Sequence, residues 1–164
     1  MLTTEQIHGM MLNYDQNISR LEIIIEGVNK AVTHLRSEEL GIDWWGTLDE
    51  KYEHELIYRL AILAFEDYLE KTIGSFKVEP SKEKDYLQLY HSEPAIDLIF
   101  SLAKYIKWNP DASEQLSKHN LNPNLYPIYH GVLALNEKRD LNAIIKRLQN
   151  WRIQLVNLAY FKSE

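Results

Sequence analysis

Residues 3–35 read TTEQIHGMMLNYDQNISRLEIIIEGVNKAVTHL, and this stretch decides the fold class. Its apolar residues recur at alternating steps of four and three: Ile7, Met11, Tyr14, Ile18, Leu21, Ile25, Val28, Val32 and Leu35. This spacing is typical of a helix whose buried seam packs nearly parallel or antiparallel to a neighbouring helix. Thr3 followed by Gln6 forms a capping-box start, so the stretch predicts one helix of ~33 residues and ~50 Å.

A second long helix follows. Thr47 with Glu50 three residues later repeats the capping-box pattern, and Gly74 is a natural C-terminal stop. The apolar residues between them fall on two adjacent faces, with Leu56, Leu60 and Leu63 on one and Ile57, Ala61, Ala64 and Tyr68 on the other. A helix that is apolar on two faces is expected at the centre of a bundle.

The remaining chain continues in helices. Pro94 marks one helix start, and the pairs at 109–110 and 122–123 repeat the signal, with a short polar helix near 110–118 and a break or kink at Pro127. Asp140 opens the last strong helix, and no alternating apolar and polar run predicts a strand. We therefore expect an all-α helical bundle with a long N-terminal helix, about five to seven helices in total, in a single domain over residues 1–164.

The amino-acid composition excludes several kinds of site. The chain of 164 residues contains 45% hydrophobic residues and no cysteine, which excludes disulfides, thiolate metal sites and cysteine nucleophiles. The N-terminus lacks the basic and apolar run of a secretory signal, and each apolar stretch is shorter than the ~20 residues that span a bilayer. These features predict a cytoplasmic protein with no membrane segment.

Charge is unevenly distributed along the chain, whose net charge is −6. Residues 38–70 hold ten acidic side chains against two basic ones, a balance of −8, whereas residues 137–164 carry +3. The two regions either complement each other within the fold, or the acidic one forms a surface that steers a basic protein partner. The negative net charge argues against nucleic-acid binding, and Lys146, Arg147 and Arg152 on the last helix are the candidate phosphate contacts of that alternative.

Catalytic patterns are missing from the sequence. It has no phosphate-binding glycine loop and no nucleophile elbow, and in the run His54-Glu55-Leu56-Ile57-Tyr58 a tyrosine replaces the second zinc-binding histidine, so we interpret His54 as a surface residue. We expect no catalytic residue and no cofactor.

One metal-dependent alternative remains open. Carboxylates one helical turn apart could hold Mg²⁺ for hydrolysis of a nucleotide, and the pairs are Glu22 with Glu26 and Glu50 with Glu53. Solvated helix faces explain the same residues without a metal.

Two aromatic segments are candidate interaction sites. Trp44 and Trp45 are adjacent in a glycine-flanked segment beside Asp43, where they either plug the end of the bundle or contact a partner. Residues 120–129, with Tyr126 and Tyr129, form a proline-ordered loop that suits binding or helix capping. The leading hypothesis is a non-enzymatic protein–protein interaction module, such as an adaptor, inhibitor, antitoxin- or immunity-like neutraliser or assembly subunit. A homodimer paired through the N-terminal seam is one variant of it.

Overall fold

The computed structural model describes residues 1–38, 50–76, 83–108 and 113–160. The helices within these ranges are α1 (Thr4–Asn13), α2 (Ile18–Glu38), α3 (Glu50–Ser75), α4 (Glu83–Ser92), α5 (Pro94–Trp108), α6 (Ser113–Ser117), α7 (Pro127–Leu135) and α8 (Leu141–Tyr160). No strand occurs in the described ranges, which confirms the all-α prediction. If α1 and α2 are counted as one divided helix, the described helices number seven, within the predicted range.

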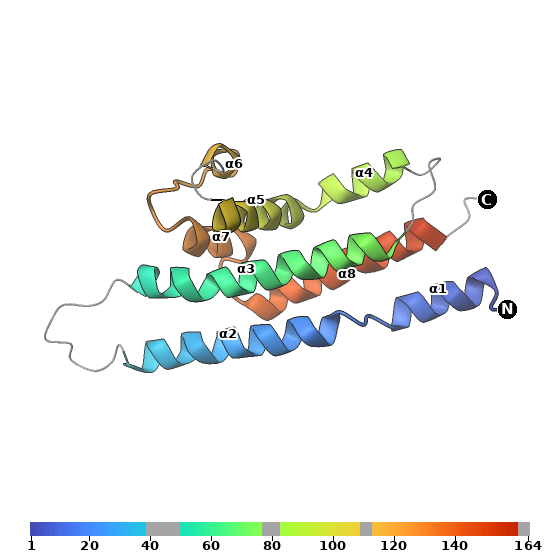
Figure 1. Ribbon diagram of the computed structural model, residues 1–164, viewed down its shortest axis with the longest axis horizontal. Helices are drawn as coiled ribbons and strands as arrows, with labels where there is room; N and C mark the ends of the chain where they lie inside the picture. The colour runs from blue at the N-terminus through green and yellow to red at the C-terminus, as the bar shows by residue number, and fades with distance from the viewer. Residues whose placement is uncertain (39–49, 77–82, 109–112, 161–164) are drawn as a thin grey trace, which may run out of the picture.

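The helices lie in three rows (Figure 1). The first row contains α1 and α2, the middle row α3 and α8, and the last row α4 to α7, with both chain ends at the same end of the molecule. α2 runs antiparallel to α3, and α1 runs antiparallel to α8. α3 contacts α2, α5, α7 and α8, which confirms its central position.

The predicted seam is buried along α2. Leu21, Ile25, Val28 and Val32 are each at most 7% exposed and belong to one core cluster with residues of α3 and α8. Burying one such aliphatic side chain contributes roughly 1.5–3 kcal/mol to stability. The four-and-three spacing therefore identified the face that holds α2 in the bundle.

The predicted N-terminal helix is divided at residues 14–17, so its expected continuity over ~33 residues is corrected. The capping box of Thr3 and Gln6 is present and begins α1. Asp15 instead caps a turn that leads into α2: its side chain accepts a hydrogen bond from the backbone N–H of Asn17 (3.1 Å), and its carbonyl accepts one from Ile18 (3.3 Å). A short acidic side chain that caps the backbone competes with a continuous helix.

Local capping fixes the start of the last two helices. Pro127 does not kink a helix but stands in the first turn of α7, where its missing N–H costs nothing. Asp140 accepts backbone hydrogen bonds from Asn142 (2.9 Å) and Ala143 (3.2 Å) and thereby caps α8. Among the described helices, none combines the length and the hydropathy that crossing a bilayer requires.

Candidate functional site

The first aromatic candidate lies outside the described residues. Asp43, Trp44 and Trp45 fall in the range 39–49, and the side chain of Glu50 is also not described. These predicted contacts therefore stay predictions.

The second aromatic candidate is largely built into the core. Tyr126 precedes α7 in a left-handed conformation (φ 47°) and packs partly buried against the core, while Tyr129 is 8% exposed. The Tyr129 hydroxyl accepts a hydrogen bond from Arg139 Nη1 (3.0 Å), whose guanidinium also lies 5.2 Å from the ring centre. The contact area of Tyr129 is thus used inside the protein rather than offered to a partner.

The described acidic candidates do not form a metal site. Glu22 and Glu26 lie exposed on α2, and Glu26 Oε1 is 2.6 Å from Lys30 Nζ, which holds the pKa of Glu26 below its ordinary value. Glu53 is half-buried on α3. Within the described ranges, no group of three or more His, Cys, Asp or Glu side chains is placed to hold a metal ion. The magnesium-dependent alternative gains no support there.

Two of the three basic candidates on α8 are engaged in contacts within the chain. Arg147 pairs with Glu93 and donates to the carbonyl of Leu135 (2.8 Å), while Lys146 is exposed. Arg152 is 6% exposed and donates to two backbone carbonyls of the N-terminal region. Because Arg152 is buried and Arg147 is paired with a carboxylate, both guanidinium groups are poorly placed to bind phosphates.

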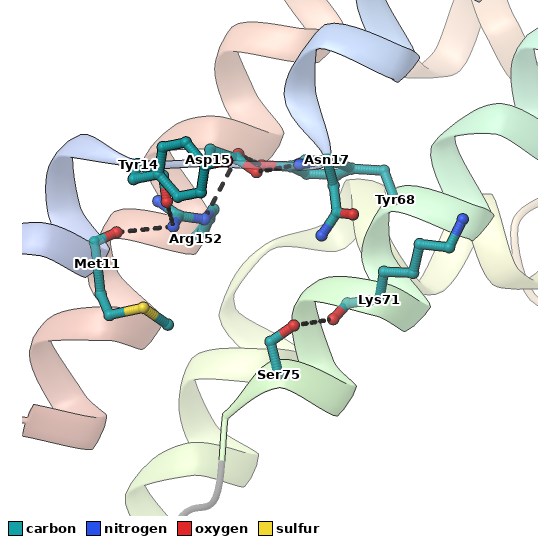
Figure 2. A network of polar contacts seen from close by, with 8 residues as sticks. All are labelled: Met11, Tyr14, Asp15, Asn17, Tyr68, Lys71, Ser75 and Arg152. Carbon is teal, nitrogen blue, oxygen red and sulfur yellow. Dashed lines mark hydrogen bonds and ion pairs between the residues drawn. The ribbon is translucent and has the colours of Figure 1, made fainter.

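Arg152 belongs to a polar network that joins α8 to the break between α1 and α2 (Figure 2). Its Nη2 donates to the carbonyls of Met11 (2.7 Å) and Tyr14 (2.8 Å), and its Nε lies 3.4 Å from Asp15 Oδ2. The same carboxylate oxygen accepts a 2.5 Å hydrogen bond from the Tyr68 hydroxyl of α3. Burial and the neighbouring Asp15 carboxylate raise the pKa of Tyr68, so this hydroxyl keeps its proton and acts as a donor. Sequence analysis missed this network, although an arginine on the apolar face of α8 was a usable signal.

Glu55, the acidic residue next to His54, forms a second buried polar contact. Glu55 is 5% exposed and accepts backbone hydrogen bonds from Ile128 (3.1 Å) and Tyr129 (2.7 Å), so it caps α7 from α3. Burial raises the pKa of Glu55, while these two hydrogen bonds pull it down. His54 is fully buried beside the rings of Tyr58 and Tyr129, at 5.8 and 6.2 Å between centres, so its predicted surface position was wrong.

The outer face of α3 carries an uncovered apolar stripe. Tyr52, Leu56 and Leu60 are 55%, 47% and 59% exposed, and Leu63 is half-buried. Residues two positions apart in a helix point in directions that differ by ~200°. Leu56 and Leu60 therefore point away from the core, into which Tyr58 and Ile62 point. We call Tyr52, Leu56, Leu60 and Leu63 the α3 stripe. α3 is central as predicted, but the helices around it leave one of its two apolar faces open to solvent.

The C-terminal end of the α3 stripe is acidic. Glu66 Oε2 lies 2.6 Å from Lys107 Nζ of α5, and Asp67 Oδ2 lies 2.5 Å from Lys71 Nζ. The pKa of Lys107 is raised, mainly by its hydrogen bond to Glu66 and also by the charges of Glu70 and Asp67. Glu70 adds a third carboxylate at this end, and Arg20 of α2 lies beside Asp67 and Lys71.

This surface offers apolar contact beside charged side chains. A straight row of exposed leucines beside carboxylates is suited to binding another amphipathic element. No protein-family model, curated protein or solved structure matches the chain.

Proposed function

We propose that this chain is a non-enzymatic protein-interaction module that binds its partner through the α3 stripe. The supporting observation is the exposure of Leu56 and Leu60, 47% and 59%, on the most central helix of the bundle. Large apolar side chains that are aligned and exposed on a folded surface mark interaction sites. Adaptors, inhibitors, neutralisers of other proteins and assembly subunits all act through such a surface.

The partner that fits is an amphipathic helix with basic flanks. The stripe residues are spaced four, four and three apart, which forms a ridge along α3 that the i, i+3, i+4 ridges of a second helix can pack against. Lysine or arginine on the flank of that helix would meet the carboxylates of Asp67 and Glu70. Full burial of one leucine contributes roughly 1.5–3 kcal/mol, so Leu56 and Leu60 together can dominate the affinity.

The test uses a synthetic amphipathic helix with leucine on one face and lysine on its flanks. Its affinity for wild type is compared by fluorescence anisotropy with its affinity for the Leu56→Gln/Leu60→Gln double variant, because glutamine keeps helix propensity while removing the apolar contact. The double variant should bind at least about tenfold more weakly, equivalent to ~1.4 kcal/mol. Leu87→Gln on α4, which changes a leucine 48% exposed elsewhere, should bind as wild type does.

Two results would overturn this proposal. One is equal affinity of the double variant and Leu87→Gln for the lysine peptide. The other is equal binding of a peptide with the same leucine face but glutamate flanks, which would refute the basic partner. In cell extract, the natural partner should be retained by Leu87→Gln and lost by the double variant. A homodimer that the double variant dissociates would instead make a second copy the occupant of the stripe.

A further inference from the structure

The N-terminal helix α1 is held on α8 by few contacts. No residue of α1 is fully buried, and Met11 and Leu12 are its partly buried apolar contacts with the core. His8 Nε2 lies 3.0 Å from Asn157 Oδ1 of α8, and Arg152 binds the C-terminal carbonyls of α1. A helix of ten residues is marginally stable in water by itself, so α1 depends on its contacts with the rest of the chain. We call the surface that His8, Met11 and Leu12 of α1 contact the seat of α1.

Side chains from distant elements keep the break open at residues 14–17. In a continuous helix, the carbonyls of Met11 and Tyr14 would accept hydrogen bonds from the backbone N–H groups of Asp15 and Ile18. Arg152 occupies both carbonyls instead, and the Ile18 N–H bonds to the carbonyl of Asp15 (3.3 Å). Figure 2 shows Arg152 and Tyr68 meeting at Asp15. The break therefore rests on the Asp15 carboxylate and its two partners.

The sequence itself is compatible with a helix across this break. The apolar spacing passes from Met11 through Tyr14 to Ile18 without a change of phase, and residues 14–17 include neither proline nor glycine. In the structure, the seam is only partly buried before the break. Ile7 and Tyr14, which continue the seam of α2, are 36% and 68% exposed, while Met11 and Leu12 pack partly buried against the core and His8 contacts α8.

We propose that α1 is an exchangeable arm that a second copy of this chain accepts on its own α8. In the exchanged dimer residues 14–17 become helical, α1 and α2 form one helix, and each α1 occupies the seat on the other chain. The seat contacts of His8, Met11 and Leu12 are kept, because both seats are identical. Backbone hydrogen bonds take over the carbonyls of Met11 and Tyr14, and the buried Arg152 loses these two acceptors, which favours the unexchanged form at low protein concentration.

Because the chain has no cysteine, single thiols can report which chain an arm occupies. Chains carrying His8→Cys are mixed with chains carrying Asn157→Cys, concentrated, and treated with a short bismaleimide. A covalent dimer between the two kinds of chain forms when the α1 of one lies on the α8 of the other. For the wild-type hinge, its yield should rise with protein concentration during incubation.

Two hinge variants with opposite effects complete the test. Asp15→Ala removes the cap and the acceptor at the break, and should raise the yield of the mixed dimer at least about tenfold at equal concentration. Gln16→Pro places proline in the second position of the turn from Asp15 to Ile18, where proline is favoured, whereas inside a continuous helix it would remove a hydrogen bond and clash. This variant should abolish the mixed dimer while circular dichroism shows an intact fold.

The outcomes separate the alternatives. The exchangeable arm is refuted if wild type gives no mixed dimer at any concentration, or if wild type and Gln16→Pro give equal yields. If Asp15→Ala does not fold, the comparison of wild type with Gln16→Pro decides by itself. The result does not depend on the α3 stripe, so a failed peptide-binding test and a failed exchange test remain distinguishable.

Discussion

At the residue scale, Gly131 allows α7 to approach α5 closely. A Cβ atom added at Gly131 would lie 2.6 Å from Cδ1 of the fully buried Leu102. Leu102 would have to move within a dense core, so Gly131→Ala should lower the free energy of unfolding by about 1–3 kcal/mol. Urea denaturation followed by circular dichroism measures this loss.

The matched control is Gly27→Ala in the middle of α2. A Cβ atom there has no neighbour within 4 Å, and alanine favours a helix over glycine by about 0.5–1 kcal/mol. Gly27→Ala should therefore raise the midpoint of unfolding. If Gly131→Ala is as stable as wild type, the close approach of α5 and α7 is not real.

The capping carboxylate Glu55 should give stability an unusual dependence on pH. Burial raises its pKa above the ordinary value of 4.5, so as pH rises the unfolded chain releases this proton before the folded chain does. The folded state then binds more protons, and the contribution of Glu55 to the free energy of unfolding falls as pH rises. Relative to Glu55→Gln, wild type should lose stability as pH rises above the ordinary pKa of 4.5, as urea titrations at a series of pH values would measure.

An exposed ion pair supplies the control of opposite sign. Lys30 lowers the pKa of Glu26, so the contribution of Glu26 grows as pH rises toward 4.5 and is lost in acid. Relative to Glu26→Gln, wild type should gain stability over the acid range, by a small amount because the pair is exposed to solvent. The same direction of change for both carboxylates would contradict the cause assigned to Glu55.

At the element scale, local patterns predicted most helices, because helix starts and buried faces depend on residues close in sequence. The capping box of Thr3, the cap of Asp140 and the seam from Leu21 to Val32 all appear as expected. The break at residues 14–17 could not be predicted in this way. It depends on Arg152, which is 138 positions away from Tyr14 in the sequence and reaches it only in the folded chain.

The exposure of one face of α3 could not be predicted from the sequence pattern either. Both of its predicted faces are apolar, and the helices that cover one of them come from elsewhere in the chain. α2, α5, α7 and α8 pack around the face that contains Tyr58 and Ile62, and the face that contains Leu56 and Leu60 remains open. Local residues show that a face is apolar, but the packing of distant elements decides whether the protein itself buries it.

At the scale of the whole molecule, the interaction surface combines an apolar row with the negative charge of the chain. The net charge is −6, and the exposed side chains of Asp67 and Glu70 lie at one end of the α3 stripe. Apolar contacts act at short range and set how slowly a bound helix leaves. Charges act over roughly 10 Å at 0.1 M salt and set how fast it arrives.

Ionic strength should therefore change the rate at which the lysine-flanked peptide associates and not the rate at which it dissociates. In stopped-flow fluorescence, the association rate constant should fall severalfold between about 0.05 and 0.5 M NaCl, while the dissociation rate constant stays nearly constant. Glu70→Lys should reduce this salt dependence, because it reverses a charge beside the stripe. Glu5→Lys, which makes the same change on the exposed surface of α1, should leave more of it intact. An association rate that is independent of salt would show that the acidic end of the stripe does not attract its partner, and would leave the apolar row as the sole source of recognition.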